Sequence, residues 1–181
     1  MITSWLKLSE SQEKVGWKTI VHKTFMMPDG EPADYTTIGL PGAQNAAVIA
    51  LTPDNRVVVA RQFRAGPEAI FDELPGGGVE AGEDPALAAV RELCEETGYA
   101  SDEPPVKLGT SCRDAYVNET NNYYLLRNCR SVGTPEPDDR EFVEPTLISI
   151  ETLLTNAKAG KMSDVPAVLM AYDRLMKLKE K

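Results

Sequence analysis

The chain has 181 residues, of which 42% are hydrophobic, and a formal net charge of −9. This length predicts a domain of ordinary size with a real core, together with a small N-terminal extension. The acidic balance argues against a nucleic-acid-binding surface, which needs a basic patch, but divalent cations and a few arginines can still neutralise an anionic small molecule.

The apolar pattern predicts short strands interrupted by a few helices. In chain order we expect strands at 17–26, 34–39, 45–51, 56–61 and 70–74, a helix from Pro85 to Gly98, strands at 106–110, 123–127 and 142–148, and helices at 150–157 and from about 164 to 178. Strands around a helix in mid-sequence predict an α/β fold, an α/β/α sandwich with a mixed sheet. Residues 1–42 are expected to form a β extension and residues 43–181 the main domain. Residues 131–140, rich in Pro, Asp and Glu, are expected to be a lid or a solvated connector.

The cysteines and the single histidine restrict the chemistry. Cys94, Cys112 and Cys129 are odd in number and lack a CxxC spacing, which predicts three reduced thiols in the cytoplasm. His22 stands alone, which argues against histidine-based zinc sites and Ser-His-Asp triads. The N-terminus has no hydrophobic signal core, and the longest apolar run, 46–51, is too short to span a bilayer.

The most informative segment reads GGVEAGEDPALAAVRELCEETGY, from Gly77 to Tyr99. Glu83 is followed eight residues later by the pair Arg91-Glu92, and then by Glu95-Glu96 and Gly98. A random acidic stretch would rarely reproduce such a spacing. The segment therefore predicts a specific site rather than a general acidic surface.

Helical geometry indicates what this spacing is for. At about 100° per residue, Glu92, Glu95 and Glu96 fall on one arc of the helix. Another arc, which we expect to face the core, holds Ala86, Leu87, Val90, Leu93 and Cys94. Like charges three and four residues apart repel, and a cation between them would remove that penalty. Hard oxygen ligands select Mg²⁺ or Mn²⁺, and a backbone carbonyl of the run Gly76–Gly78 can complete the metal shell. A solvated acidic helix face is the alternative interpretation.

The segment resembles the Nudix box, Gly-x5-Glu-x7-Arg-Glu-U-x-Glu-Glu-x-Gly-U, in which U is a bulky aliphatic residue. Tyr99 replaces the last U, as is common in the ADP-ribose pyrophosphatase branch. The stretches VARQFR (59–64) and DELPGG (72–77) also resemble the approach to the box in that branch. Residues 110–117 differ from it, because they lack the proline that these enzymes typically carry about sixteen residues beyond the box.

The resemblance implies roles for individual residues. It implies a metal site formed by the Gly76 carbonyl, Glu92 and Glu96, with Glu95 as a further carboxylate near the metals. Arg91 would orient the box glutamates, and Glu83 would be a ligand or a structural residue. Substrate contacts are expected from Arg61, Arg64, Glu73 and Tyr116. A general base is expected from a downstream loop, with Glu141 as the best candidate among Asp138, Asp139, Glu141 and Glu144.

The resemblance also implies an activity. We expect metal-dependent hydrolysis of a nucleoside diphosphate derivative, with ADP-ribose or an ADP-sugar as the substrate and AMP and a sugar phosphate as the products. NADH, a dinucleoside polyphosphate, a damaged nucleoside triphosphate or another nucleotide sugar are alternative substrates. A Nudix module that senses nucleotide sugars without cleaving them is an alternative of another class. The expected protein partner is a second copy of the chain, in a homodimer built with the N-terminal strands; no nucleic acid or membrane partner is expected.

Overall fold

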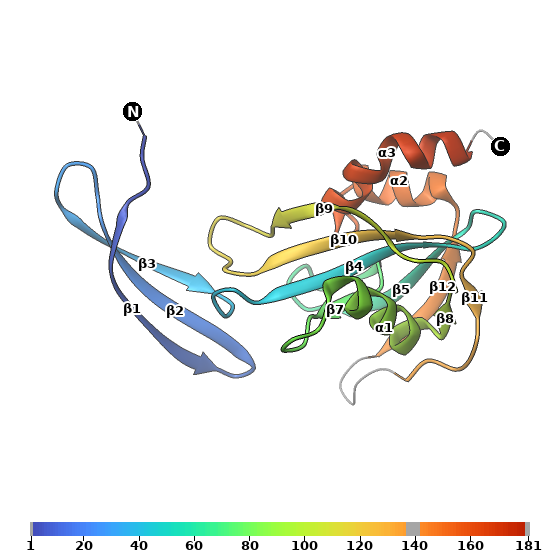
Figure 1. Ribbon diagram of the computed structural model, residues 1–181, viewed down its shortest axis with the longest axis horizontal. Coiled ribbons are helices and arrows are strands. Elements are labelled where there is room, and N and C mark those ends of the chain that lie inside the picture. The colour runs from blue at the N-terminus through green and yellow to red at the C-terminus, as the bar shows by residue number, and fades with distance from the viewer. Residues whose placement is uncertain (1, 137–141, 180–181) are drawn as a thin grey trace. The chain divides into compact units, whose positions relative to one another are not determined.

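The computed structural model describes residues 2–136 and 142–179, and the chain divides into two compact units. The smaller unit comprises the residues up to Ala43 together with Cys112–Thr120. The larger unit comprises Gln44–Ser111 and the described residues from Asn121 onward (Figure 1). The predicted extension thus makes up most of the smaller unit.

Three antiparallel strands form the smaller unit, in the order β1 (Leu6–Val15), β2 (Lys18–Met26) and β3 (Pro32–Ile38). Gly16, with φ of 60°, permits the tight turn between β1 and β2. The prediction omitted β1, because its sequence is mostly polar. In the structure every residue of β1 is exposed.

A central sheet forms the larger unit, with the strand order β12-β5-β4-β10-β9. Its strands are β4 (Gln44–Leu51), β5 (Val57–Arg64), β6 (Ala69–Glu73), β7 (Gly76–Gly78), β9 (Val106–Cys112), β10 (Thr120–Leu126) and β12 (Val143–Ile148). Two short strands, β8 (Tyr99–Ala100) and β11 (Arg130–Ser131), pair with each other.

Helices cover both faces of this sheet (Figure 1). On one face, α1 (Pro85–Thr97) packs over small apolar residues of β4 and β5 such as Ala46, Val48 and Val58. On the other face, α2 (Ile150–Lys158) and α3 (Val165–Lys179) pack over Ile49, Val59 and other residues of the larger core cluster. The predicted α/β/α sandwich is therefore confirmed.

The pairing between β4 and β5 is interrupted, and we call this interruption the seam of the sheet. β4 and β5 pair with each other only at Ala50↔Val58 and Leu51↔Val57. Beyond that point β6 pairs with β5, up to Ala60↔Glu73, and β7 pairs with β4, from Ala47↔Gly76. The chain therefore passes from β5 to β4 between Glu73 and Gly76. The glycine segment, which lies outside the predicted strands, is in fact part of the sheet.

The three cysteines are free thiols, as predicted; Cys94 and Cys112 are exposed and Cys129 is buried. Burial raises the pKa of the Cys129 thiol to about 11. Within the part of the chain that the structure describes, no helix is long and apolar enough to cross a membrane.

Candidate active site

Local capping sets both ends of α1, where the sequence predicts them. The side chain of Asp84 accepts a hydrogen bond from the Ala86 N–H at 2.8 Å, and Pro85 occupies the first turn. Gly98 adopts the left-handed conformation, with φ of 68°, and its N–H donates to the Cys94 carbonyl at 2.8 Å. The helix thereby holds the box residues in a defined orientation.

The prediction of which residues of α1 are buried is partly wrong. Leu87 is 64% exposed and Cys94 is exposed, whereas Ala88, Ala89 and Leu93 are buried. The helix packs through its alanines, whose small side chains let it approach the sheet closely, and this displaces the larger Leu87 to the surface. Apolar periodicity alone cannot detect such a preference for small residues.

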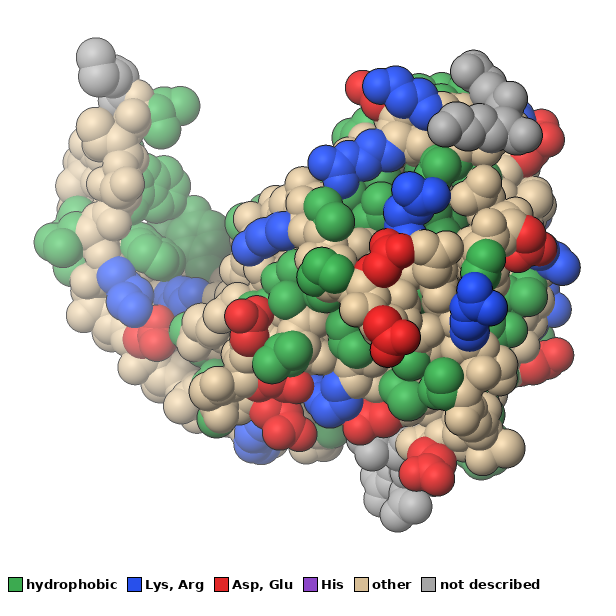
Figure 2. Space-filling view, turned by 45° about the vertical axis from the view of Figure 1, so that its right-hand side comes forward, with side chains coloured by type: hydrophobic (Ala, Val, Ile, Leu, Met, Phe, Trp, Pro, Cys, Tyr) green, Lys and Arg blue, Asp and Glu red, His purple; other side chains and the backbone are tan. Residues whose placement is uncertain are grey.

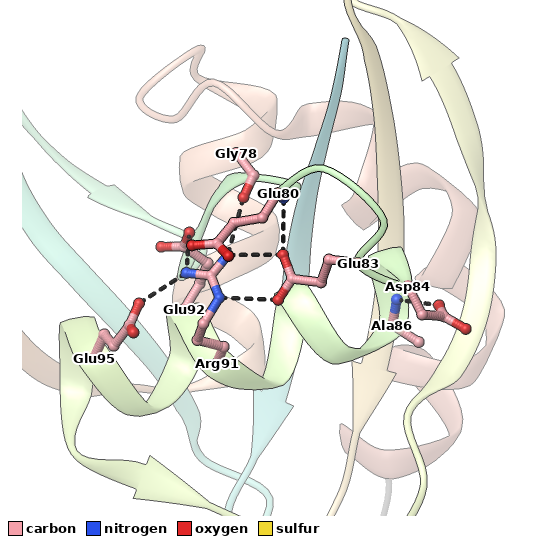
Figure 3. Close-up of polar contacts among 8 residues, drawn as sticks. All are labelled: Gly78, Glu80, Glu83, Asp84, Ala86, Arg91, Glu92 and Glu95. Carbon is pink, nitrogen blue, oxygen red and sulfur yellow. Dashed lines mark hydrogen bonds and ion pairs between the residues drawn. The ribbon is translucent and has the colours of Figure 1, made fainter.

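Arg91 joins the acidic residues of the box (Figure 3). Its Nε donates to Glu83 at 2.9 Å, and its Nη1 donates to Glu92 and Glu95, each at 2.9 Å. Its Nη2 donates to the Gly78 carbonyl at 3.0 Å. These bonds, led by that with Glu83, raise the pKa of Arg91 above its ordinary range. Hydrogen bonding from Arg91 and from the backbone of Glu80 lowers the pKa of Glu83.

Two glutamates of α1 meet the glycine segment. The carboxylate of Glu96, which is buried, accepts a hydrogen bond from the Gly76 N–H at 2.9 Å. A Cβ atom on Gly77 would lie within 2.7 Å of the Glu92 carboxylate, so this glycine leaves space for that group. The carboxylates of Glu92 and Glu96 thus both lie against the backbone of the glycine segment.

This donor set fits a hard divalent cation. It consists of carboxylate and carbonyl oxygens with no histidine or cysteine, which suits Mg²⁺ or Mn²⁺ better than zinc. Among the described residues, no three His, Cys, Asp or Glu side chains are already grouped as a metal cage. Instead, Arg91 forms ion pairs with Glu92 and Glu95.

The two arginines expected at the substrate lie on β5. Arg61 Nε donates to Asp72 at 2.8 Å, and this bond raises the pKa of Arg61. Arg64 Nη2 lies 3.8 Å from Glu73, and the Arg64 side chain is 40% exposed. Glu73 has no exposed area, and its carboxylate accepts hydrogen bonds from Ser163. This burial does not favour a direct substrate contact by Glu73.

Tyr116 belongs to the smaller unit. It lines a pocket of about 460 Å³ together with Trp5, Phe25, Tyr35 and Lys23. The candidate base Glu141 lies outside the described residues, as do Asp138 and Asp139. Glu144 is described and pairs with Arg61 across β12 and β5.

Two residues that contact the predicted substrate residues were not identified from the sequence. Ser163 donates to Glu73, which lies 90 residues away in the chain. Asp72 accepts hydrogen bonds from Arg61 at 2.8 Å and from Asn156 of α2 at 3.3 Å. No spacing motif links such distant positions, so only the three-dimensional structure could identify them.

An α/β/α sandwich that presents helix glutamates to a glycine strand defines the class of Nudix-type hydrolases. The NUDIX domain family model matches residues 42–168, and the chain belongs to this family.

On the face that Figure 2 shows, acidic and basic side chains lie interspersed over the larger unit.

Several relatives are similar over most of their length. The chain is 29% identical to the methanol dehydrogenase activator of Bacillus methanolicus, covering 79% of this chain and 77% of the relative. It is 29% identical to the ADP-ribose pyrophosphatase of Bacillus subtilis (76% and 74%) and 30% identical to the ADP-sugar pyrophosphatase of Mus musculus (88% and 78%).

A crystal structure of an ADP compounds hydrolase shares the fold. It has a TM-score of 0.79 at 17% identity, over 98% of this chain and 97% of the other. The protein is thus a Nudix pyrophosphatase related to ADP-ribose and ADP-sugar pyrophosphatases.

Proposed function

We propose that this enzyme hydrolyses the pyrophosphate bond of ADP-ribose or an ADP-sugar, giving AMP and a sugar phosphate. The observation that carries the proposal is the convergence of Glu92 and Glu96 on the Gly76–Gly77 backbone, with Arg91 aligning the acidic residues. The pyrophosphatases among the relatives support this substrate class.

Mg²⁺ or Mn²⁺ would be held by Glu92, Glu96 and the Gly76 carbonyl, with Glu95 beside them. When bound, a divalent ion neutralises diphosphate charge and lowers the pKa of a water molecule. In the overall reaction water adds to one phosphorus and the bridging P–O bond breaks, leaving two phosphate monoesters. Glu141 is our proposal for the group that accepts the proton of the water.

Arg61 and Arg64 are proposed to contact the phosphates or ribose. Both arginines lie on β5 of the larger unit, and their positively charged side chains are partly exposed. Tyr116 is proposed to stack on a ring of the substrate, since aromatic neighbours line its pocket.

The proposal is tested by a product-resolved hydrolysis screen with Mg²⁺ or Mn²⁺. The panel comprises ADP-ribose, other nucleotide sugars, NADH, dinucleoside polyphosphates and nucleoside triphosphates. We expect AMP from ADP-ribose, at a rate abolished by EDTA. Turnover of another compound in place of ADP-ribose would change the substrate assignment but not the type of reaction. Tight ligand binding without turnover would favour the alternative of a nucleotide-sugar-sensing module.

Glu96→Gln tests the metal assignment within the same screen. A glutamine oxygen can still accept the Gly76 N–H, so the fold should persist. Turnover should fall by about a hundred-fold or more, because even residues that only support metal ligands contribute about 10–100-fold. The matched control is Glu31→Gln, at an exposed turn of the smaller unit, which should retain wild-type turnover. Near-normal activity of Glu96→Gln would rule out this assignment.

We also propose that the enzyme is a homodimer. The support comes from the smaller unit, whose strand β1 is exposed along its whole length and includes Leu6 and Leu8. A second copy of the chain would cover such a strand.

A further inference from the structure

The larger unit contains a buried carboxylate, that of Glu73, which is not one of the proposed metal ligands. Glu73 has no exposed area, and burial of a carboxylate is costly unless donors surround it. Its Oε1 and Oε2 accept the Ser163 N–H at 3.0 and 3.3 Å, and the Ser163 hydroxyl donates to Oε2. Ser163 lies in the connection between α2 and α3, two residues before α3 begins.

Glu73 is located where the chain crosses the seam of the sheet. It is the last residue of β6, which pairs with β5, and Gly76 is the first residue of β7, which pairs with β4. The Pro75 carbonyl accepts the Val48 N–H at 3.0 Å. The Gly76 N–H donates to Glu96. The crossing is thus anchored by Glu73 at its start and by Glu96 at its end.

Gly76 has little freedom to move. A Cβ atom there would collide with the Ala46 carbonyl and lie within 2.7 Å of the Ala47 Cα. Any displacement of its carbonyl therefore requires the crossing as a whole to move. A buried space-filling residue could be apolar, since replacing buried ion pairs by apolar residues is often neutral or stabilising. The charge of Glu73 therefore needs an explanation beyond packing.

We infer that Glu73, fixed by Ser163, is a positioning residue for the metal site and for Arg64. Through the crossing it determines where the Gly76 carbonyl lies. Through the 3.8 Å approach of Arg64 Nη2 it also orients a partly exposed guanidinium. The inference rests on the proposed function, because it takes the Gly76 carbonyl as a metal ligand.

The test measures Mn²⁺ binding by isothermal titration calorimetry without substrate, together with kcat and KM. Glu73→Gln and Ser163→Ala should each weaken Mn²⁺ affinity about ten-fold, the scale expected for partners of metal ligands. Glu73→Gln should also raise KM, because Arg64 loses its counter-charge. Ser163→Ala should leave KM near the wild-type value, because the charge of Glu73 remains. Ser163→Thr retains the hydroxyl at an exposed residue and should restore Mn²⁺ affinity.

Ser149→Ala is the matched control for a purely structural effect. Ser149 caps α2 by accepting the Thr152 N–H at 3.0 Å, so its loss should lower the melting temperature without changing Mn²⁺ affinity. Folded Glu73→Gln and Ser163→Ala variants with Mn²⁺ affinity within about two-fold of wild type would overturn the inference. A wild-type enzyme that binds Mn²⁺ but cleaves no nucleotide sugar would overturn only the proposed function. Absence of Mn²⁺ binding by the wild type would overturn both.

Discussion

Arg91 shows how one side chain can stabilise a cluster of acidic residues. Three carboxylates, on Glu83, Glu92 and Glu95, accept hydrogen bonds from its guanidinium. A lysine has three donors on a single nitrogen and could not reproduce this planar arrangement. Arg91 therefore both offsets repulsion along the helix and keeps the carboxylates aligned.

Cys129 provides a prediction at the residue scale. Desolvation raises its pKa from the ordinary value of 9.0 to about 11, so the folded state keeps the thiol neutral. The resulting contribution to the unfolding free energy is fully present below about pH 9 and is lost as the pH rises to about 11, because the unfolded chain ionises first. The difference in unfolding free energy between wild type and Cys129→Ala should shrink over this range, as measured by denaturant titration. If the difference in unfolding free energy between the two proteins did not change with pH, this would contradict the raised pKa of Cys129.

At the scale of elements, β7 combines two tasks in three glycines. It closes the sheet against β4, and it brings its backbone to the carboxylates of Glu92 and Glu96. A Cβ atom on Gly77 would meet the Glu92 carboxylate, and one on Gly76 would meet the Ala46 carbonyl. Glycine is required here for close approach rather than for flexibility.

Substitution of neighbouring glycines should separate these requirements. Gly77→Ala should push the Glu92 carboxylate away and strongly reduce metal-dependent turnover, because the new Cβ would meet that group. Gly78→Ala is the matched control, since its Cβ would meet nothing within 4 Å and should leave turnover close to wild type. The measurement is turnover against Mg²⁺ concentration for both folded variants. Equal activities would show that the Glu92 position does not depend on Gly77.

Much of the fold follows from local patterns, and much of the site does not. Strands β4 and β5, the caps of α1 and the placement of Glu92, Glu95 and Glu96 on one helix are visible in the sequence, since they depend on nearby residues. Strand β1 was missed because it lacks an apolar alternation, and β7 because glycines carry no strand signal. The anchoring of Glu73 by Ser163 is a contact over 90 residues and has no local signature.

At the scale of the whole molecule, the smaller unit has little core of its own. Its buried residues include Val21, Thr19 and Thr37, while Trp5, Leu6 and Trp17 expose large apolar areas. Three strands usually need an apolar face packed against another layer to be stable. A second chain is the partner that we propose for this layer.

The proposed dimer can be tested by sedimentation equilibrium. A dimer of the 19.8 kDa chain should have a mass of about 40 kDa. Leu6→Glu, at a residue 67% exposed on β1, should shift the protein towards the monomer by placing a charge in the interface. Val132→Glu, at a residue 63% exposed in the larger unit, is the matched control and should remain dimeric. A monomeric wild-type protein would contradict the proposal.

The seam between β4 and β5 also has an evolutionary consequence. Because residues 69–78 complete the sheet, mutations in this segment should affect folding and the proposed metal site together. Such a segment can accept few changes, and a new substrate preference cannot readily arise there. Diversification of this enzyme should therefore proceed through peripheral positions, such as the exposed end of β5 near Phe63, while the seam remains nearly invariant.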